Sequence, residues 1–189
     1  MSAKLSERDE KLIKELIKAR VLQDIQEHLI DQGNGVILIT CSDGDRFPEI
    51  FLHQVRLQEK CRPDPRIHTL AWNGGALACA PNSPINKSNG DEQIFLDQIA
   101  GARELKKIDQ AVAEVHWPCG MATRFHLAIE EVLALLVAAK DEIKLYNPGM
   151  KVACFFPVDF GTKQRTFFFS RRDWKIWADR HGVIYHAGC

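Results

Sequence analysis

Four short, largely apolar runs impose the strongest constraint on how this chain folds. The first of them, Val36-Ile37-Leu38-Ile39-Thr40, is continuous rather than alternating, which is typical of a strand buried on both faces of a sheet. The four runs cover residues 36–40, 67–72, 111–116 and 151–156. Helical patterns separate them at residues 49–60, 92–108 and 122–146. This alternation predicts an α/β fold, a mainly parallel central β-sheet flanked by helices, with further edge strands at 166–170 and 183–186.

The N-terminal segment, residues 6–32, has the pattern of one amphipathic helix. Ser6 is a suitable N-cap, and Gly33-Asn34-Gly35 ends the pattern. The apolar residues of this segment are spaced three or four apart, at Leu12, Ile13, Leu16, Ile17, Val21, Ile25 and Leu29. We therefore expect a single domain over residues 1–189 with an N-terminal helical arm over 1–32, packed on its own sheet or on another subunit. Turn-forming residues predict an exposed loop at 80–91.

Charge and hydropathy exclude several classes of protein. The 25 Lys and Arg residues are balanced by 25 Asp and Glu residues, so the chain has no general attraction for nucleic acid. The longest apolar stretch, Val132–Ala139, is far shorter than the roughly 18 residues that cross a bilayer. Charged residues occupy the N-terminus, where a secretory signal needs an apolar core. We therefore expect a cytoplasmic protein without a nucleic-acid or membrane partner.

Three candidate metal ligands lie at or shortly after the ends of predicted strands. Cys41 directly follows the first strand, His116 ends the third, and Cys119 stands three residues further along. Parallel strands end at one edge of the sheet, where open α/β folds bind ligands. Two thiolates and one imidazole suit zinc and leave a fourth position for water. In the competing interpretation, Cys41 and Cys119 are only small buried hydrophobic residues.

The surroundings of these ligands add detail. Pro118 is expected in the first turn of the next helix, with Cys119 near the positive end of that helix. Asp43 follows Cys41 closely enough to accept a hydrogen bond from metal-bound water or to bind the metal. His126, expected on the same helix as Cys119, is a possible proton shuttle. The six cysteines lack the dense spacing of a disulfide framework, and four of them are expected not to bind metal: Cys61, Cys79, Cys154 and Cys189.

Two motifs of the sequence resemble those of the β-class carbonic anhydrases. The family's Cys-x-Asp-x-Arg is similar to Cys41-Ser42-Asp43-Gly44-Asp45, and its His-x-x-Cys-Gly is similar to His116-Trp117-Pro118-Cys119-Gly120. Asn73-Gly74-Gly75 stands where the family has an Asn-Ala-Gly type of loop. The resemblance covers roughly residues 10 to 156 and implies a β-carbonic-anhydrase-like fold.

The resemblance also implies a cofactor and an activity. Cys41, His116 and Cys119 would bind Zn²⁺, and Asp43 would be the catalytic acidic residue beside the metal. The protein would hydrate CO₂ or a related small linear electrophile through zinc-bound water or hydroxide, as a lyase of the carbonate dehydratase type. It would form a homodimer or a higher homo-oligomer. The substrate pocket would be lined by Asn73, Gly74, Gly75 and Gly120.

One departure from the family pattern bears directly on activity. Asp45 stands where the family has an arginine that pairs with the motif aspartate and holds it away from the metal. Without that arginine, Asp43 is free to close the fourth zinc position. The alternative function is therefore a non-catalytic or switchable zinc-binding homologue. Arg46, Arg66 or a residue of a partner subunit are the candidates to replace the missing cation.

The C-terminal segment, residues 163–180, combines six basic residues with Trp174 and Trp177. A solvated basic face over two buried indoles explains this composition better than a site for an anionic partner.

Overall fold

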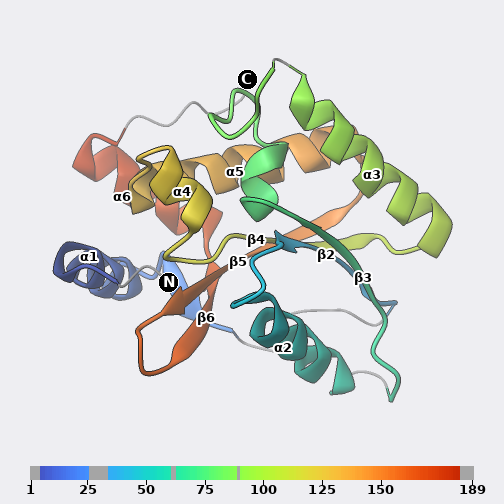
Figure 1. Cartoon of the computed structure of the whole chain (residues 1–189), viewed down its shortest axis with the longest axis horizontal. Coiled ribbons are helices and arrows are strands. Elements are labelled where there is room, and N and C mark those ends of the chain that lie inside the picture. The colour runs from blue at the N-terminus through green and yellow to red at the C-terminus, as the bar shows by residue number, and fades with distance from the viewer. Residues whose placement is uncertain (1–4, 26–33, 61–62, 89, 184–189) are drawn as a thin grey trace.

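The computed structural model describes residues 5–25, 34–60, 63–88 and 90–183. They form an α/β fold with a six-stranded mixed sheet between helices, which confirms the predicted fold class (Figure 1). The strands are β1 (Leu22–Asp24), β2 (Val36–Cys41), β3 (Ile67–Trp72), β4 (Gln110–Glu114), β5 (Lys151–Asp159) and β6 (Gln164–Phe169). The helices are α1 (Glu7–Lys18), α2 (Phe47–Glu59), the 3₁₀ helix η2 (Gly75–Cys79), α3 (Asp91–Lys106), α4 (Gly120–Arg124), α5 (Ile129–Tyr146) and α6 (Arg171–His181).

The order of strands in the sheet is β1-β6-β5-β4-β2-β3. The four strands predicted from the apolar runs are parallel to one another, while β6 is antiparallel to β5 and β1 is antiparallel to β6. In the centre, Ile39 of β2 pairs with Ala113 of β4. The carboxyl ends of β2 and β4 therefore lie side by side.

Helices cover both faces of the sheet and create two hydrophobic cores. Figure 1 shows α2 on one face and α3, α4, α5 and α6 on the other. The smaller core lies under α2 and includes Leu38, Ile50 and Phe155. The larger core lies between the sheet and the other helices and takes in most remaining buried side chains. All six residues of β2 are buried, as its continuous apolar pattern predicts for a central strand.

The prediction of one helix over residues 6–32 is wrong. Ser6 does cap the helix, accepting a hydrogen bond from the Asp9 N–H, but α1 ends at Lys18. Arg20 takes a positive φ of 62°, and the chain turns into β1, where Leu22 pairs with Phe169. Pairing with an open sheet edge satisfies backbone groups that a longer helix would bond internally, so tertiary structure overrides the helical spacing here. Leu29, the last residue of the predicted stripe, lies outside the described residues.

Three further boundaries differ from the prediction. The helical pattern at 122–146 is divided into α4 and α5 by a turn in which His126 has a φ of 54°. Residues 171–181, read from sequence only as a solvated face, form α6. Val183 is not in a strand, and the rest of the predicted strand at 183–186 lies outside the described residues. Among the described residues, none of the helices has the length and hydropathy that a membrane span requires.

Side chains of helix α1 contact side chains of helix α6 within the same chain. Ile13 and Leu16 of α1 are fully buried in the larger core, so the arm packs on its own sheet. Glu15 accepts a hydrogen bond from the Trp177 indole at 3.0 Å and lies 3.1 Å from His181 Nε2. Trp174 and Trp177 are buried, as the interpretation of the basic segment predicts.

A half-buried histidine on α2 makes stability sensitive to acid. The ring of His53 lies 5.9 Å from that of Phe155, and burial, with a smaller effect of the Arg56 charge, lowers the pKa of His53 from 6.5 to about 4. Between about pH 6.5 and pH 4 the unfolded chain therefore takes up a proton that the folded chain does not. We expect the contribution of His53 to the free energy of unfolding to fall by up to about 3 kcal/mol across this window, measured by urea denaturation as the difference in pH dependence between the wild type and a variant that lacks the imidazole.

The matched variants are His53→Leu and His68→Leu. The first is expected to flatten the pH dependence, because the titrating group is removed. The second removes His68 of β3, which is half-exposed and whose pKa is also lowered by burial. It is expected to change the pH dependence of the free energy of unfolding less. Equal pH slopes for the wild type and His53→Leu would contradict the assignment to His53.

Candidate metal centre

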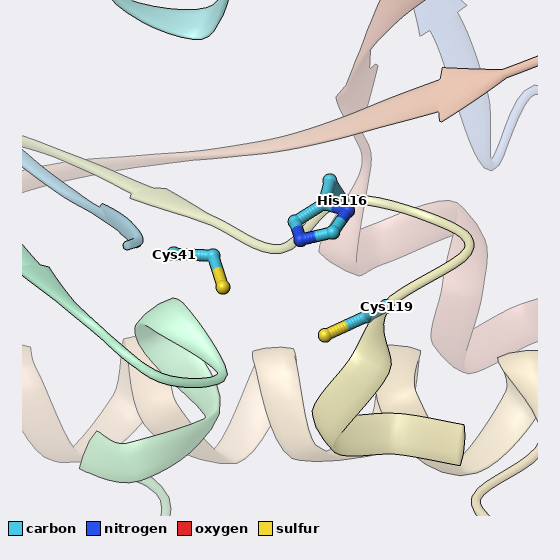
Figure 2. Close-up of side chains that lie close together, drawn as sticks. All are labelled: Cys41, His116 and Cys119. Atoms are coloured by element: carbon cyan, nitrogen blue, oxygen red, sulfur yellow. The ribbon is translucent and has the colours of Figure 1, made fainter. Parts of the chain in front are cut away.

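The three predicted ligands converge at the carboxyl edge of the sheet. Cys41 is the last residue of β2, His116 lies just beyond β4, and Cys119 is the N-cap of α4. Their side chains point toward one another, as Figure 2 shows. The two Sγ atoms and an imidazole nitrogen lie within 4.8 Å of one another, so a single ion can contact all three. The residues are 5%, 2% and 1% exposed, respectively.

Backbone groups turn both thiols toward this point. The Gly74 N–H donates to Cys41, and the N–H groups of Met121 and Ala122 at the start of α4 donate to Cys119. A hydrogen bond from the Cys119 thiol lowers the pKa of Cys41 to about 4, and the same hydrogen bond raises the pKa of Cys119. The pair thus shares one proton, and Cys41 already has the thiolate character that zinc requires.

The imidazole of His116 also fits a metal ligand. Both ring nitrogens are buried and have no hydrogen-bond partner among the described residues. Buried polar atoms without a partner are costly and rare in folded proteins. A cation between the thiols would give one of these nitrogens a partner. Two thiols and one imidazole are a donor set typical of zinc, so the residues present fit this metal.

Asp43 lies beside the ligand group. Its Oδ2 is 3.7 Å from His116 Nε2, and its Oδ1 accepts a hydrogen bond of 3.0 Å from the Asp45 N–H. The backbone carbonyl of Asp43 accepts from Arg46 and Phe47 at the start of α2. One carboxylate oxygen is therefore held by the turn while the other faces His116. The side chain of Asp45 is exposed, so its charge is screened by solvent.

The turn at residues 73–75 packs directly against Cys41. An added Cβ on Gly75, which has a φ of 56°, would lie 2.6 Å from the Glu114 carbonyl oxygen and 2.9 Å from the Cys41 nitrogen. Only glycine fits this close approach. The Trp72 indole N–H donates to the Gly75 carbonyl at 2.6 Å, and Ser42 Oγ donates to Asn73 Oδ1 at 3.1 Å. Three of the predicted pocket residues are thus fixed beside the ligand group.

Gly120 directly follows Cys119 and is exposed, and an added Cβ there would meet no atom within 4 Å. Two other predictions for the site are corrected. Pro118 precedes the N-cap of α4 and is not in its first turn, because the helix begins at Gly120. His126 is exposed in the turn between α4 and α5 rather than on a helix.

The two arginines named as replacements for the missing family cation both have other partners. Arg46 pairs with Asp159 at the end of β5. Arg66 precedes β3, at the opposite edge of the sheet, where it donates to the carbonyls of Asn34 and Lys106.

The remaining cysteines stay apart from the metal group. Cys79 and Cys154 are buried in the larger core, and burial raises the pKa of Cys154 to about 11. Neither belongs to a cluster of potential ligands among the described residues, as predicted. Cys61 and Cys189 lie outside those residues.

The loop at 80–91 is partly packed rather than wholly exposed. Asn86 donates to the Ala78 carbonyl at 3.1 Å, and the Ile85 side chain lies against Gly74. Ile85 therefore covers the outer side of the turn that supports Cys41, while Lys87 and Ser88 are exposed.

Two features beside the site were missed by sequence reasoning. Glu114 is fully buried at the end of β4, neither carboxylate oxygen has a hydrogen-bond partner among the described residues, and burial raises its pKa well above the usual range. A charged residue inside the apolar run 111–116 was the available signal. The pairing of Arg46 with Asp159 had no signal, because the two residues are far apart in the sequence.

Comparisons with known proteins find resemblance only among solved structures. No protein-family model matches the chain, and no curated protein matches it significantly. Among solved structures, the chain is similar to the β-carbonic anhydrase CafA of the fungal pathogen Aspergillus fumigatus, with a TM-score of 0.38 and 14% sequence identity. The alignment covers 92% of this chain and 94% of that chain. At this level of similarity, no residue role is carried over from that protein.

Proposed function

We propose that this protein is a carbonic-anhydrase-like zinc protein that hydrates CO₂ or a related small linear electrophile. The observation that carries the proposal is the buried group of Cys41, His116 and Cys119 at the carboxyl edge of a parallel sheet. This donor set, together with the motif resemblance described above, fits a catalytic rather than a purely structural zinc site. When bound, zinc supplies Lewis-acid chemistry that makes water a nucleophile near neutral pH.

The chain's own residues would divide the remaining tasks. Cys41, His116 and Cys119 would hold the metal, and the backbone N–H groups directed at the thiols would stabilise their charge. Asp43 would accept a hydrogen bond at Oδ2, the oxygen that faces His116. The turn at residues 73–75, fixed by Trp72, would form one wall of a small pocket beside Cys41. Gly120 remains a candidate for its rim.

The proposal is tested by zinc analysis and by stopped-flow CO₂ hydration between pH 6 and pH 9. We expect one zinc per chain, a hydration rate above that of the buffer, and inhibition by small anions such as azide. Removal of zinc by a chelator is expected to abolish the rate, and added zinc is expected to restore it. Folded, zinc-loaded protein that gives only the buffer rate would exclude the catalytic function.

A second candidate is a non-catalytic or switchable zinc protein in which Asp43 is the fourth ligand. The 3.7 Å approach of Asp43 Oδ2 to His116 Nε2 favours it. X-ray absorption spectroscopy of the zinc protein distinguishes the two candidates, because a fourth ligand from Asp43 disappears in Asp43→Ala.

The same proposal covers the cellular compartment and the oligomeric state of the protein. A reducing compartment such as the cytoplasm keeps thiol ligands in the state that zinc requires. We expect a homodimer or higher homo-oligomer, and light scattering measures this oligomeric state. The expected partner is a small-molecule substrate, and no nucleic-acid or membrane partner is expected.

A further inference from the structure

We propose that Arg46 and Asp159 act as a positioning pair that fixes the Asp43 turn to the segment carrying His116 and Cys119. The inference rests on the proposed zinc site and assigns a role to two residues outside it. In this proposal, neither Arg46 nor Asp159 contacts the metal or the substrate directly.

Arg46 is fixed relative to Asp43. It is the N-cap residue of α2, and its backbone N–H donates to the Asp43 carbonyl at 3.0 Å. The next residue, Phe47, donates to the same carbonyl at 2.8 Å. Any force on the Arg46 backbone is therefore transmitted to the Asp43 turn through two short hydrogen bonds.

Asp159 is fixed relative to the other two ligands. It ends β5, and its backbone N–H donates to the Trp117 carbonyl at 2.8 Å, while the Trp117 N–H donates to Pro157 at 2.7 Å. Trp117 lies between His116 and Cys119 in the sequence. The Gly161 N–H donates to Asp159 Oδ1 at 2.7 Å, which leaves Oδ2 for the Arg46 guanidinium.

The pair bridges the two ligand-bearing segments where the sheet no longer does. The paired register of β2 and β4 ends at Ile39 and Ala113, before Cys41 and His116 are reached. Beyond that point, the contact between Arg46 and Asp159 joins the segment after β2 to the end of β5.

Burial distinguishes this ion pair from a more exposed one on the same sheet. The side chains of Arg46 and Asp159 are 14% and 16% exposed, whereas those of Arg165 and Asp24 are 45% and 75% exposed. A partly desolvated pair with oriented hydrogen bonds contributes more to positioning than a solvated one. The Arg46 guanidinium is thereby directed to Asp159.

The experiment measures zinc affinity by chelator competition with the metal alone, and the visible spectrum of the Co²⁺-substituted protein. Arg46→Gln and Asp159→Asn are each expected to weaken zinc binding about tenfold and to change the cobalt bands, because orienting residues around metal ligands contribute on this scale. The double variant is expected to bind no more weakly than either single variant, since both remove one interaction. Asp159→Asn retains an oxygen to accept from Gly161.

Two further variants keep the result interpretable. Arg46→Lys retains the charge and is expected to bind zinc within about threefold of the wild type, since the ion pair is conserved. It also provides the measurement if Arg46→Gln does not fold. Arg165→Gln removes the exposed pair with Asp24 on the same sheet and is expected to leave zinc affinity unchanged.

Folded Arg46→Gln and Asp159→Asn proteins with wild-type zinc affinity and cobalt spectrum would overturn the inference, as would strictly additive losses in the double variant. An Arg46→Lys protein as weak as Arg46→Gln would overturn it too. A wild-type protein that binds no zinc would instead defeat the proposed function, so the two failures are distinguishable.

Discussion

The Cys119→Ser protein is expected to contain almost no zinc after dialysis against a chelator, whereas the wild type retains one zinc per chain. Removing one of three protein ligands weakens binding by about a thousandfold, since zinc sites of this kind gain several kcal/mol from each ligand. Zinc is expected to raise the melting temperature of the wild type and not that of Cys119→Ser, because only a ligand that binds the folded state stabilises it. Metal analysis and thermal melting measure both effects.

The matched control is Cys154→Ser. Cys154 is fully buried but lies outside the metal group, so its replacement is expected to lower stability without lowering the zinc content. If Cys119→Ser kept its zinc, or if Cys154→Ser lost it as completely, the assignment of the ligands would be wrong.

Replacing Asp43 is expected to change the CO₂ hydration rate more than any substitution outside the metal ligands. If Asp43 accepts a hydrogen bond in the reaction, Asp43→Asn lowers the rate about a hundredfold, the lower end of the range for such groups, with zinc content unchanged. If Asp43 is instead the fourth ligand, Asp43→Ala opens that position, and the rate rises from the buffer level. Stopped-flow measurement of both variants distinguishes the two roles by the sign of the change.

The substitution Asp45→Arg tests the same two roles of Asp43 from a neighbouring residue. Asp45 already bonds to Asp43 Oδ1 through its backbone, so an arginine side chain at this position starts next to the carboxylate it would pair with. Under the closed arrangement, the new ion pair is expected to draw Asp43 from the metal and raise the hydration rate. Unchanged rates in the Asp43 and Asp45 variants, all folded and zinc-loaded, would contradict both roles of Asp43.

The strands of the sheet could be predicted because burial on both faces leaves a plain sequence signal. Val36–Thr40 is apolar throughout, and β2 lies in the middle of the sheet. The end of α1 had no such signal. Val21 and Ile25 continue the helical spacing, and only pairing with β6, which is distant in the sequence, directs the chain into β1.

The candidate metal centre was predictable for a similar reason. Cys41, His116 and Cys119 follow strands whose parallel order brings their ends together, so one topological rule, supported by the motif resemblance, brought the three residues into one group. The partner of Arg46 was not predictable, because Asp159 is brought into place by the register of β5 beside β4 and by the contact of Trp117 with β5. A residue's charge is visible in the sequence, whereas its partner depends on this tertiary register.

The attachment of α1 and β1 to the last third of the molecule has a consequence for synthesis of the chain. Leu22 pairs with Phe169, and Glu15 contacts Trp177 and His181, so the partners of the first elements are made much later than those elements. The N-terminal segment therefore leaves the ribosome long before its docking surface exists. Its apolar residues remain without their packing partners, and exposed to chaperones, until β6 and α6 have been made.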